Sequence, residues 1–407
     1  MESSQRKKAL FIIFITVFID LVGFGIIIPL SPYLSREFGA SALQIGLLMA
    51  IYSLMQFVFS PFWGQLSDRF GRRPIILMSV FVAGVSHLAF AFSTEFWMLF
   101  VARTFAGIGG ANISTAMAYM ADISSKKDRS KTMGLIGAAF GLGFVFGPFI
   151  GGIFGEVGSS LGSAAPFGKS FSAVIASSIC LLNFIFAFFY LKESRQVNAE
   201  VTAIKLSKRI KVMFFHLKKE TVGSLMFLLF MTTFAMAHME ATLFLYVSDV
   251  FHLGMKEASF GFAYVGVVMA FTQGYLIRKW LPKFGERSLL VWGALMAGIG
   301  FLMIAMAPNV LSLGVAVTFL AIGIGLVNPS LHGGVSLLSS SDLQGEVMGV
   351  NQSLSALARI IGPATGGFIY DQVSLRSPFF IAAGFMGLVF FLSMKIYSKI
   401  PNSAKTE

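Results

Sequence analysis

The apolar run ALFIIFITVFIDLVGFGIIIPLSPYL, residues 9–34, decides the fold class of this chain. At 1.5 Å per residue, a helix over this run is about 39 Å long, which is enough to cross a hydrocarbon core of about 30 Å. Asp20 lies near the middle of the run, where a carboxylate in a bilayer helix costs about 2.5–3.5 kcal/mol. We therefore expect a transmembrane helix in which Asp20 has a partner or a task.

Similar apolar runs recur along the whole chain. Of its 407 residues, 56% are hydrophobic and 12% are charged, whereas soluble proteins have about 25% charged residues. A β-barrel would need alternating segments of about ten residues, which the sequence lacks. The sequence predicts an all-α membrane protein with twelve transmembrane helices, at 9–34, 42–66, 74–93, 97–121, 132–156, 169–191, 222–249, 257–277, 288–308, 310–337, 346–371 and 377–399.

The positive charges indicate how these helices are oriented. Lys and Arg concentrate at both termini and in the loops after even-numbered helices, except the loop 337–346. The opposite loops hold only Arg36, Lys169, Lys256 and Arg376. By the positive-inside rule we expect a multi-pass protein of the inner (plasma) membrane with both termini in the cytoplasm. The net charge of +12 thus reflects topology, and we expect no nucleic-acid partner.

The chain divides into two similar halves. A basic linker, 192–221, separates an N-terminal six-helix bundle, 1–191, from a C-terminal one, 222–407. The segment MGLIGAAFGLGFVFGPFIGG at 133–152 matches MGVNQSLSALARIIGPATGG at 348–367, with Met-Gly at the start and Gly-Pro-x-x-Gly-Gly at the end of both. FGRR at 70 likewise matches FGER at 284. Parallel repeats around a linker indicate two pseudo-twofold-related bundles that rock about a midplane site.

A polar loop, GQLSDRFGRRP at 64–74, follows the second helix. Its glycines permit close backbone approach, its arginines can face anionic headgroups or pair with carboxylates, and its aspartate can lie against a helix N-terminus. The residues of interest are Gly64, Asp68, Arg69, Gly71, Arg72 and Arg73.

The fifth helix carries small residues at regular spacing. Such residues let membrane helices approach closely, and a proline within the helix bends it. The string comprises Gly134, Gly143, Gly147, Pro148, Gly151 and Gly152.

Two opposite charges are predicted at similar depths in the first half. Asp20 lies about 16 Å from the cytoplasmic edge and Arg103, on the fourth helix, about 9 Å below the outer edge. We expect them to form an ion pair, which offsets much of the cost of two isolated charges. Protonation of Asp20 would release Arg103 and so provide a switch.

The second half has its own intramembrane charges, Glu240 and Arg359. Glu240 is either a cavity carboxylate for protons or cations or an interfacial residue. Arg359 either pairs with it or contacts an anionic group, and we count it among the candidates for the substrate cavity. Other polar residues are candidates for the wall of a substrate cavity, namely Gln44, Gln56, His87, Asn112, Gln273, His332 and Asn351. The lone Cys180 can form no intrachain disulfide, and we expect no metal site.

Together these motifs resemble the major facilitator superfamily, in particular its twelve-helix drug:proton antiporters, nearest the tetracycline-efflux branch. The resemblance implies that the loop 64–74 is a cytoplasmic latch with Asp68 near Gly345–Gly349, that the fifth-helix string is an antiporter motif, and that Arg103 is the family's intramembrane arginine. The chain departs from the pattern at Ala106, usually glutamine, and at Ser86, Met269 and Ala297, where the branch has substrate residues; Gln273 is retained.

We therefore expect a secondary active transporter that exports small amphipathic compounds in exchange for protons by rocker-switch alternating access. We expect its substrate to be lipophilic or cationic. We expect the protein to be a monomer in the lipid bilayer. The proton would be its coupling ion, and we expect no other cofactor and no enzyme activity. A symporter or uniporter of a metabolite shares the fold, and a receptor or scaffold that does not transport is the alternative from another class.

Overall fold

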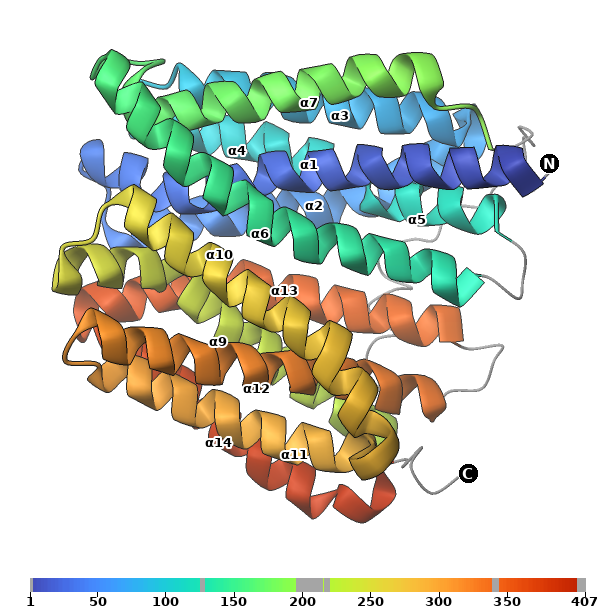
Figure 1. Ribbon diagram of the computed structural model, residues 1–407, viewed down its shortest axis with the longest axis vertical. Coiled ribbons are helices and arrows are strands. Elements are labelled where there is room, and N and C mark those ends of the chain that lie inside the picture. Colours follow the sequence, from blue (N-terminus) through green and yellow to red (C-terminus); the bar gives the residue numbers. More distant parts are fainter. Residues whose placement is uncertain (1–2, 125–128, 195–214, 216–219, 339–343, 401–407) are drawn as a thin grey trace. The chain divides into compact units, whose positions relative to one another are not determined.

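The computed structural model describes the chain except residues 1–2, 125–128, 195–214, 216–219, 339–343 and 401–407. The described residues form helices and turns without a strand (Figure 1). The helices are α1 (Ser3–Glu37), α2 (Ala42–Phe70), α3 (Arg72–Ala91), α4 (Phe96–Gly110), α5 (Ile113–Asp122), α6 (Arg129–Leu161), α7 (Phe171–Tyr190), α9 (Glu220–Phe251), α10 (Met255–Phe271), α11 (Ile277–Met306), α12 (Val310–Leu337), α13 (Gln344–Gln372) and α14 (Ser377–Lys395).

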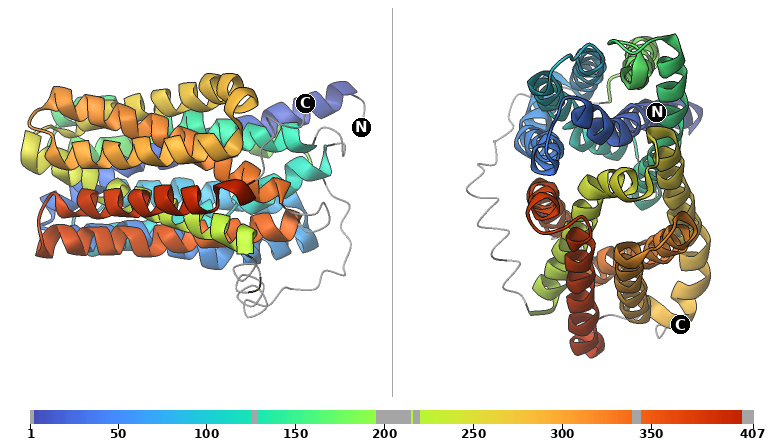
Figure 2. Two further views of the ribbon diagram at one scale, coloured as in Figure 1. Left: turned by 90° about the horizontal axis from the view of Figure 1, so that it is seen from below. Right: turned by 90° about the vertical axis from the view of Figure 1, so that its left-hand side faces the viewer.

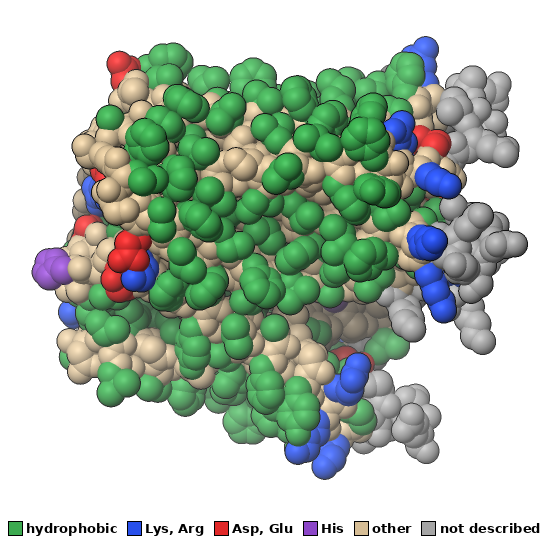
Figure 3. All heavy atoms as spheres, turned by 45° about the horizontal axis from the view of Figure 1, so that its top comes forward, with side chains coloured by type: hydrophobic (Ala, Val, Ile, Leu, Met, Phe, Trp, Pro, Cys, Tyr) green, Lys and Arg blue, Asp and Glu red, His purple; other side chains and the backbone are tan. Residues whose placement is uncertain are grey.

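Ten of the described helical stretches are long and apolar enough to cross a membrane. One of them, Met255–Met306, has 52 residues and contains two of the predicted spans. Helix α13 covers another predicted span but is not among the ten, and it is the least apolar of the long described helices. The all-α prediction is confirmed, and the arrangement is consistent with twelve spans. Figure 3 shows hydrophobic side chains over the middle of the helices on one face, with Lys and Arg gathered at one end.

The chain forms two compact units that do not follow the sequence halves strictly. One unit comprises Met1–Ala40, Ile51–Ala203 and His252–Ala263, and the other comprises Ser41–Ala50, Ile204–Phe251 and Tyr264–Glu407. Each unit thus includes a short segment from the other half of the sequence. The predicted division at 1–191 and 222–407 stays a prediction, and most of the linker lies outside the described residues.

The first unit is organised around α1, which packs against α6 and α7, while α3 packs against α4 and α7. In the right-hand view of Figure 2 the helices of each unit are seen nearly end-on. Ile13, Val17 and Leu21 of α1 lie in a buried apolar cluster with Tyr119 and Met120. Because these side chains recur every four residues, one stripe of α1 faces the cluster.

The second unit is built mainly on the pairs α11–α12, α9–α13 and α11–α14. Glycines let α11 and α12 approach closely: a Cβ atom on Gly300 would lie 2.6 Å from the backbone nitrogen of Leu320, and one on Gly293 would lie 2.8 Å from the carbonyl oxygen of Gly323. Such contacts are the way in which small residues hold membrane helices together.

Two predicted helices are interrupted. The span predicted at 97–121 is divided into α4 and α5 at Ala111 and Asn112. The helix predicted at 257–277 ends in a π-helical turn, Thr272–Leu276, which contains Gln273. Both interruptions contain polar or small residues, but hydropathy averaged over a whole span does not reveal a local change of helix geometry.

Candidate functional site

The carboxylate of Asp20 contacts an amide in the interior of the first unit. Its Oδ2 accepts a long hydrogen bond of 3.5 Å from Nδ2 of Asn112, which is itself buried. Asn112 lies at the break between α4 and α5. Asp20 therefore lies level with this break, and a neutral donor is its hydrogen-bond partner.

Arg103 is held by aromatic rings. Its guanidinium carbon lies 4.6 Å from the ring centroid of Tyr52 and 5.7 Å from that of Phe24. The side chain is 3% exposed, and its Nε and Nη1 have no hydrogen-bond partner among the described residues. A cation over such faces gains about 0.5–2 kcal/mol.

The expected ion pair between Asp20 and Arg103 is absent from the described ion pairs, so this prediction is wrong for the arrangement seen here. The reason lies in depth along the helices. Arg103 is level with Phe24, which lies one helical turn from Asp20 on the same side of α1. The Asp20–Phe24 spacing was the sequence signal that could have indicated an aromatic neighbour.

His87 faces the interior from α3. A Cβ atom on Gly23 of α1 would lie 3.6 Å from Nε2 of His87 and 2.5 Å from Sγ of Cys180. His87 and Cys180 are both buried. Gly23 thus makes room for two side chains one turn from Asp20. His87, rather than the neighbouring Ser86, is the residue of α3 that faces these groups.

The break between α4 and α5 is stabilised from α2. Nε2 of Gln56 donates to the carbonyl of Gly110 at 2.9 Å, and Nε1 of Trp63 donates to the carbonyl of Ile108 at 2.7 Å. Carbonyls freed at a helix break need such donors inside a membrane. The predicted cavity residue Gln56 therefore supports the backbone that presents Asn112.

The predicted fifth helix corresponds to α6, and most glycines of its string, the fifth-helix string, contact α1 or α10. Cβ atoms on Gly143 and Gly147 would lie 2.8 Å from Leu21 Cβ and 2.6 Å from Gly25 Cα, and one on Gly151 would lie 3.1 Å from the carbonyl oxygen of Ile26. In contrast, Gly134 has no neighbour within 4 Å. The string therefore fixes α6 against the stretch of α1 that follows Asp20.

The remaining members of the string, Pro148 and Gly152, also pack against neighbouring helices from α6. A Cβ atom on Gly25 would lie 3.3 Å from Pro148 Cδ, and one on Gly152 would lie 2.9 Å from Ser259 Cβ of α10.

Arg72 is buried, with a side chain that lies among carboxylates. It forms ion pairs of 2.7 Å with Asp68 and 3.1 Å with Asp122, and it donates to Ser67 Oγ at 2.6 Å. The prediction that it can pair with a carboxylate is confirmed, whereas a headgroup-facing position does not apply to it. Asp122 was not among the residues predicted from the sequence.

The backbone at the start of α3 is capped from a distance. The N–H groups of Arg72 and Arg73 donate to the carboxylate of Glu193 at 2.9 and 3.0 Å, and Gly71 has a φ of 100°. The Arg73 side chain donates to the carbonyl of Phe188 at 2.6 Å, and Arg69 lies over the ring of Phe70. Glu193 was also missed, because it lies over a hundred residues away in the sequence.

The other two latch residues have different outcomes. The carbonyl of Gly64 accepts a hydrogen bond from Ser67, and a Cβ atom on Gly64 would meet nothing within 4 Å. The expected position of Asp68 near Gly345–Gly349 stays a prediction.

In the second unit, Glu240 of α9 is partly buried and its charged neighbour is Arg359 of α13, whose side chain is exposed. They form none of the described ion pairs. The two amide atoms of Asn351, also on α13, are buried without a hydrogen-bond partner among the described residues. His332 and Gln273 are exposed.

Gln44 has a local structural role that differs from the predicted one. Its Oε1 accepts the backbone N–H of Ser41 at 2.8 Å, and Ser41 Oγ accepts the N–H of Gln44. This reciprocal arrangement is a capping box at the start of α2. Gln44 thus has a capping role, and the cavity-lining role stays a prediction.

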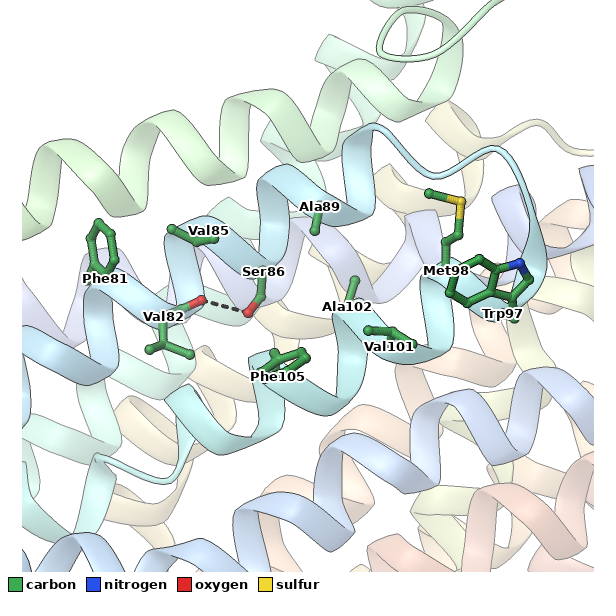
Figure 4. Close-up of a pocket in the computed structure, with 10 residues that line it drawn as sticks. All are labelled: Phe81, Val82, Val85, Ser86, Ala89, Trp97, Met98, Val101, Ala102 and Phe105. Carbon is green, nitrogen blue, oxygen red and sulfur yellow. Dashed lines mark hydrogen bonds between the residues drawn. The ribbon is translucent and has the colours of Figure 1, made fainter.

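A groove of about 470 Å³ lies between α3 and α4 (Figure 4). Its wall is apolar, and its Ser86 hydroxyl already donates to the carbonyl of Val82 at 2.6 Å. Phe81, Trp97 and Phe105 at its edge are exposed. The groove thus suits hydrocarbon and offers no free hydrogen-bond donor to a polar ligand.

This helical membrane protein holds a carboxylate, a guanidinium and an imidazole in its interior. Ionisable groups inside membrane proteins are usually functional, as in transporters and pumps. The sequence matches the family model of the Major Facilitator Superfamily over residues 13–359 and 276–407. The chain belongs to this superfamily.

Its relatives and structural neighbours agree with this assignment. The chain is 32% identical to the tetracycline resistance protein, class B, of Escherichia coli over 91% of this chain and 89% of that protein. It is 29% identical to multidrug resistance protein 2 of Bacillus subtilis (strain 168), over 95% of each. A bacterial homologue of the human lysosomal transporter Spinster, in an inward-facing and unoccupied conformation, has a TM-score of 0.80 at 16% identity and 98% coverage of both chains.

Proposed function

We propose that this protein exports small amphipathic compounds, lipophilic or cationic, in exchange for protons. Support comes from the family, from relatives that are tetracycline and multidrug resistance proteins, and from the charged interior of the first unit. The observation that carries the proposal is Asp20, which has a neutral amide as its hydrogen-bond partner while Arg103 rests on aromatic rings.

Two unpaired charges in a membrane interior are costly, and a proton on Asp20 removes one of them. The arrangement described above is then the proton-loaded one. Loss of the proton leaves a carboxylate one helical turn from the ring that supports Arg103, and the guanidinium moves from the rings toward it. The proton goes to water on the side where the site is open, and this movement is the coupling step.

The charge pattern and the family support the remainder of the proposal, which concerns the surroundings of the transporter. It works as a monomer in the inner membrane with both termini in the cytoplasm, and the two halves, 1–191 and 222–407, alternate about a midplane cavity. Arg359, Glu240, His332 and Asn351 belong to the part of the cavity formed by the second half. The energy comes from the proton gradient, in which the electrical part contributes about 2.3 kcal/mol per charge per 100 mV.

The test uses the purified protein in proteoliposomes with an imposed pH gradient and ethidium as the transported probe. We expect uphill ethidium movement against the proton flux in the wild type, and none with Asp20→Asn, because the amide cannot carry a proton. Glu95→Gln, which changes an exposed carboxylate at the turn between α3 and α4, should transport normally.

Ethidium movement that persists with the gradient collapsed would contradict coupling to protons. Movement in the same direction as the protons would favour a symporter, and Asp20→Asn with full coupling would place the proton elsewhere, with Glu240 the next candidate.

A further inference from the structure

The start of α2 is bound by a carboxylate from the far end of the sequence. Oδ1 of Asp371 accepts the backbone N–H of Ala42 at 3.1 Å, and Oδ2 accepts that of Leu43 at 2.8 Å. Asp371 lies at the C-terminal end of α13, 329 residues from Ala42. The first N–H groups of a helix lack partners within it, and the positive end of the helix dipole attracts an anion.

This carboxylate is not needed to begin the helix. The capping box of Ser41 and Gln44 already satisfies the N–H of Gln44, and the N–H of Ile45 bonds to the carbonyl of Ser41. The first turn of α2 has no acidic residue of its own. The N–H of Leu43 is at an exposed position and could otherwise bind water, whereas Ala42 is buried. The bond to Asp371 therefore mainly joins α2 to α13 and is not required to form the first turn of α2.

Backbone contact accompanies this bond. A Cβ atom on Gly46 would overlap the carbonyl oxygen of Pro363, and one on Gly367 would overlap that of Ala42. Ser41–Ala50 and α13 lie in the same compact unit, although Ser41–Ala50 belongs to the first half of the sequence. At this end, α2 thus packs in one unit with α13, whereas the remainder of α2, from Ile51 onward, belongs to the other unit.

We propose that Asp371 is an outer latch of the transport cycle. Its carboxylate holds the start of α2 against the end of α13 while the outer side is closed, and the bond breaks when the halves separate there to release substrate. This inference rests on the proposed alternating access. Asp371 acts through the position of α2 and needs no contact with substrate.

The experiment measures the separation of the outer ends by double electron–electron resonance in reconstituted protein. Spin labels replace Thr94 and Leu311, which are both exposed, in a Cys180→Ser background. For Asp371→Ala we expect the ratio of long to short distances to rise about fivefold, the factor for loss of an N-cap of about 1 kcal/mol. Asp371→Asn, which keeps one acceptor but loses the charge, should give an intermediate ratio.

Tyr370→Phe is the matched control. The Tyr370 hydroxyl donates to Asp249 of α9 at 2.8 Å, so this variant removes a hydrogen bond one residue away that lies within the second half. We expect its distance ratio to equal that of the wild type. An equal shift in Tyr370→Phe, or no change in Asp371→Ala, would overturn the latch. Because no substrate is involved, failure of proton coupling would leave this measurement unaffected.

Discussion

At the scale of single residues, the interior of the first unit separates an acid from a base. Asp20 bonds to Asn112 at the helix break, and Arg103 rests on Tyr52 and Phe24 one turn away. A permanent salt bridge between Asp20 and Arg103 would be the same in every conformation and would not favour one conformation over another. Under the proposed function, a second arrangement in which the two charges pair would give the protein two states between which a proton can shift the population.

The unpaired guanidinium leads to a prediction about stability. A buried charge without an ionic partner costs free energy, because the interior solvates it less well than water does. We expect Arg103→Met to melt at the same or a higher temperature in a thermal-shift assay. Proton release on binding of ethidium, followed with a pH dye in weakly buffered detergent, should nevertheless be lost, because the carboxylate no longer has its alternative partner.

A marked fall in the melting temperature of Arg103→Met would show instead that the guanidinium is a structural element. Arg103→Lys is a useful comparison, since an ammonium keeps the charge but lacks the planar face that stacks on Tyr52 and Phe24.

At the scale of elements, the contact between α1 and α6 depends on glycine at particular positions. Most of the fifth-helix string faces α1, but the same motif includes Gly134, whose surroundings are open. The motif is therefore not uniform in its physical role, although its members are alike in sequence.

This difference predicts opposite results for the same substitution. Gly147→Ala places a Cβ atom 2.6 Å from Gly25 Cα and 2.8 Å from the carbonyl oxygen of Val22, and overpacking of this kind costs about 1–3 kcal/mol. Gly134→Ala meets nothing and should gain up to about 1 kcal/mol of helix propensity. Denaturant unfolding of the two variants in detergent would show this split, and equal stabilities would contradict the packing described.

At the scale of the whole molecule, the repeat in the sequence is also a repeat in backbone conformation. Gly71 has a φ of 100° and Gly285 has a φ of 72°, and each precedes a buried charged residue, Arg72 and Glu286. The duplicated chain thus kept a turn that only glycine adopts easily. The charge that follows the turn differs in sign between the halves.

Gly285→Ala should therefore destabilise the protein by about 1–3 kcal/mol, because φ 72° with ψ 169° is nearly confined to glycine. Gly261→Ala, in the regular helix α10 with no neighbour within 4 Å, should not. The melting temperatures of the two variants are compared in the same detergent. An equal fall in melting temperature would mean that a side chain at position 285 does not strain the backbone of the turn.

The sequence by itself determined the helices, the repeat and the family-defining motifs, because hydropathy, glycine spacing and loop charge are local properties of the chain. It also located the charged residues in the spans. Only the tertiary structure decided their partners: Asn112 for Asp20, aromatic rings for Arg103, Asp122 for Arg72 and the start of α2 for Asp371. Partner choice depends on where each helix breaks and on how it is rotated about its axis. Successive side chains point about 100° apart in any α-helix, and tertiary packing decides which of them face a neighbouring helix.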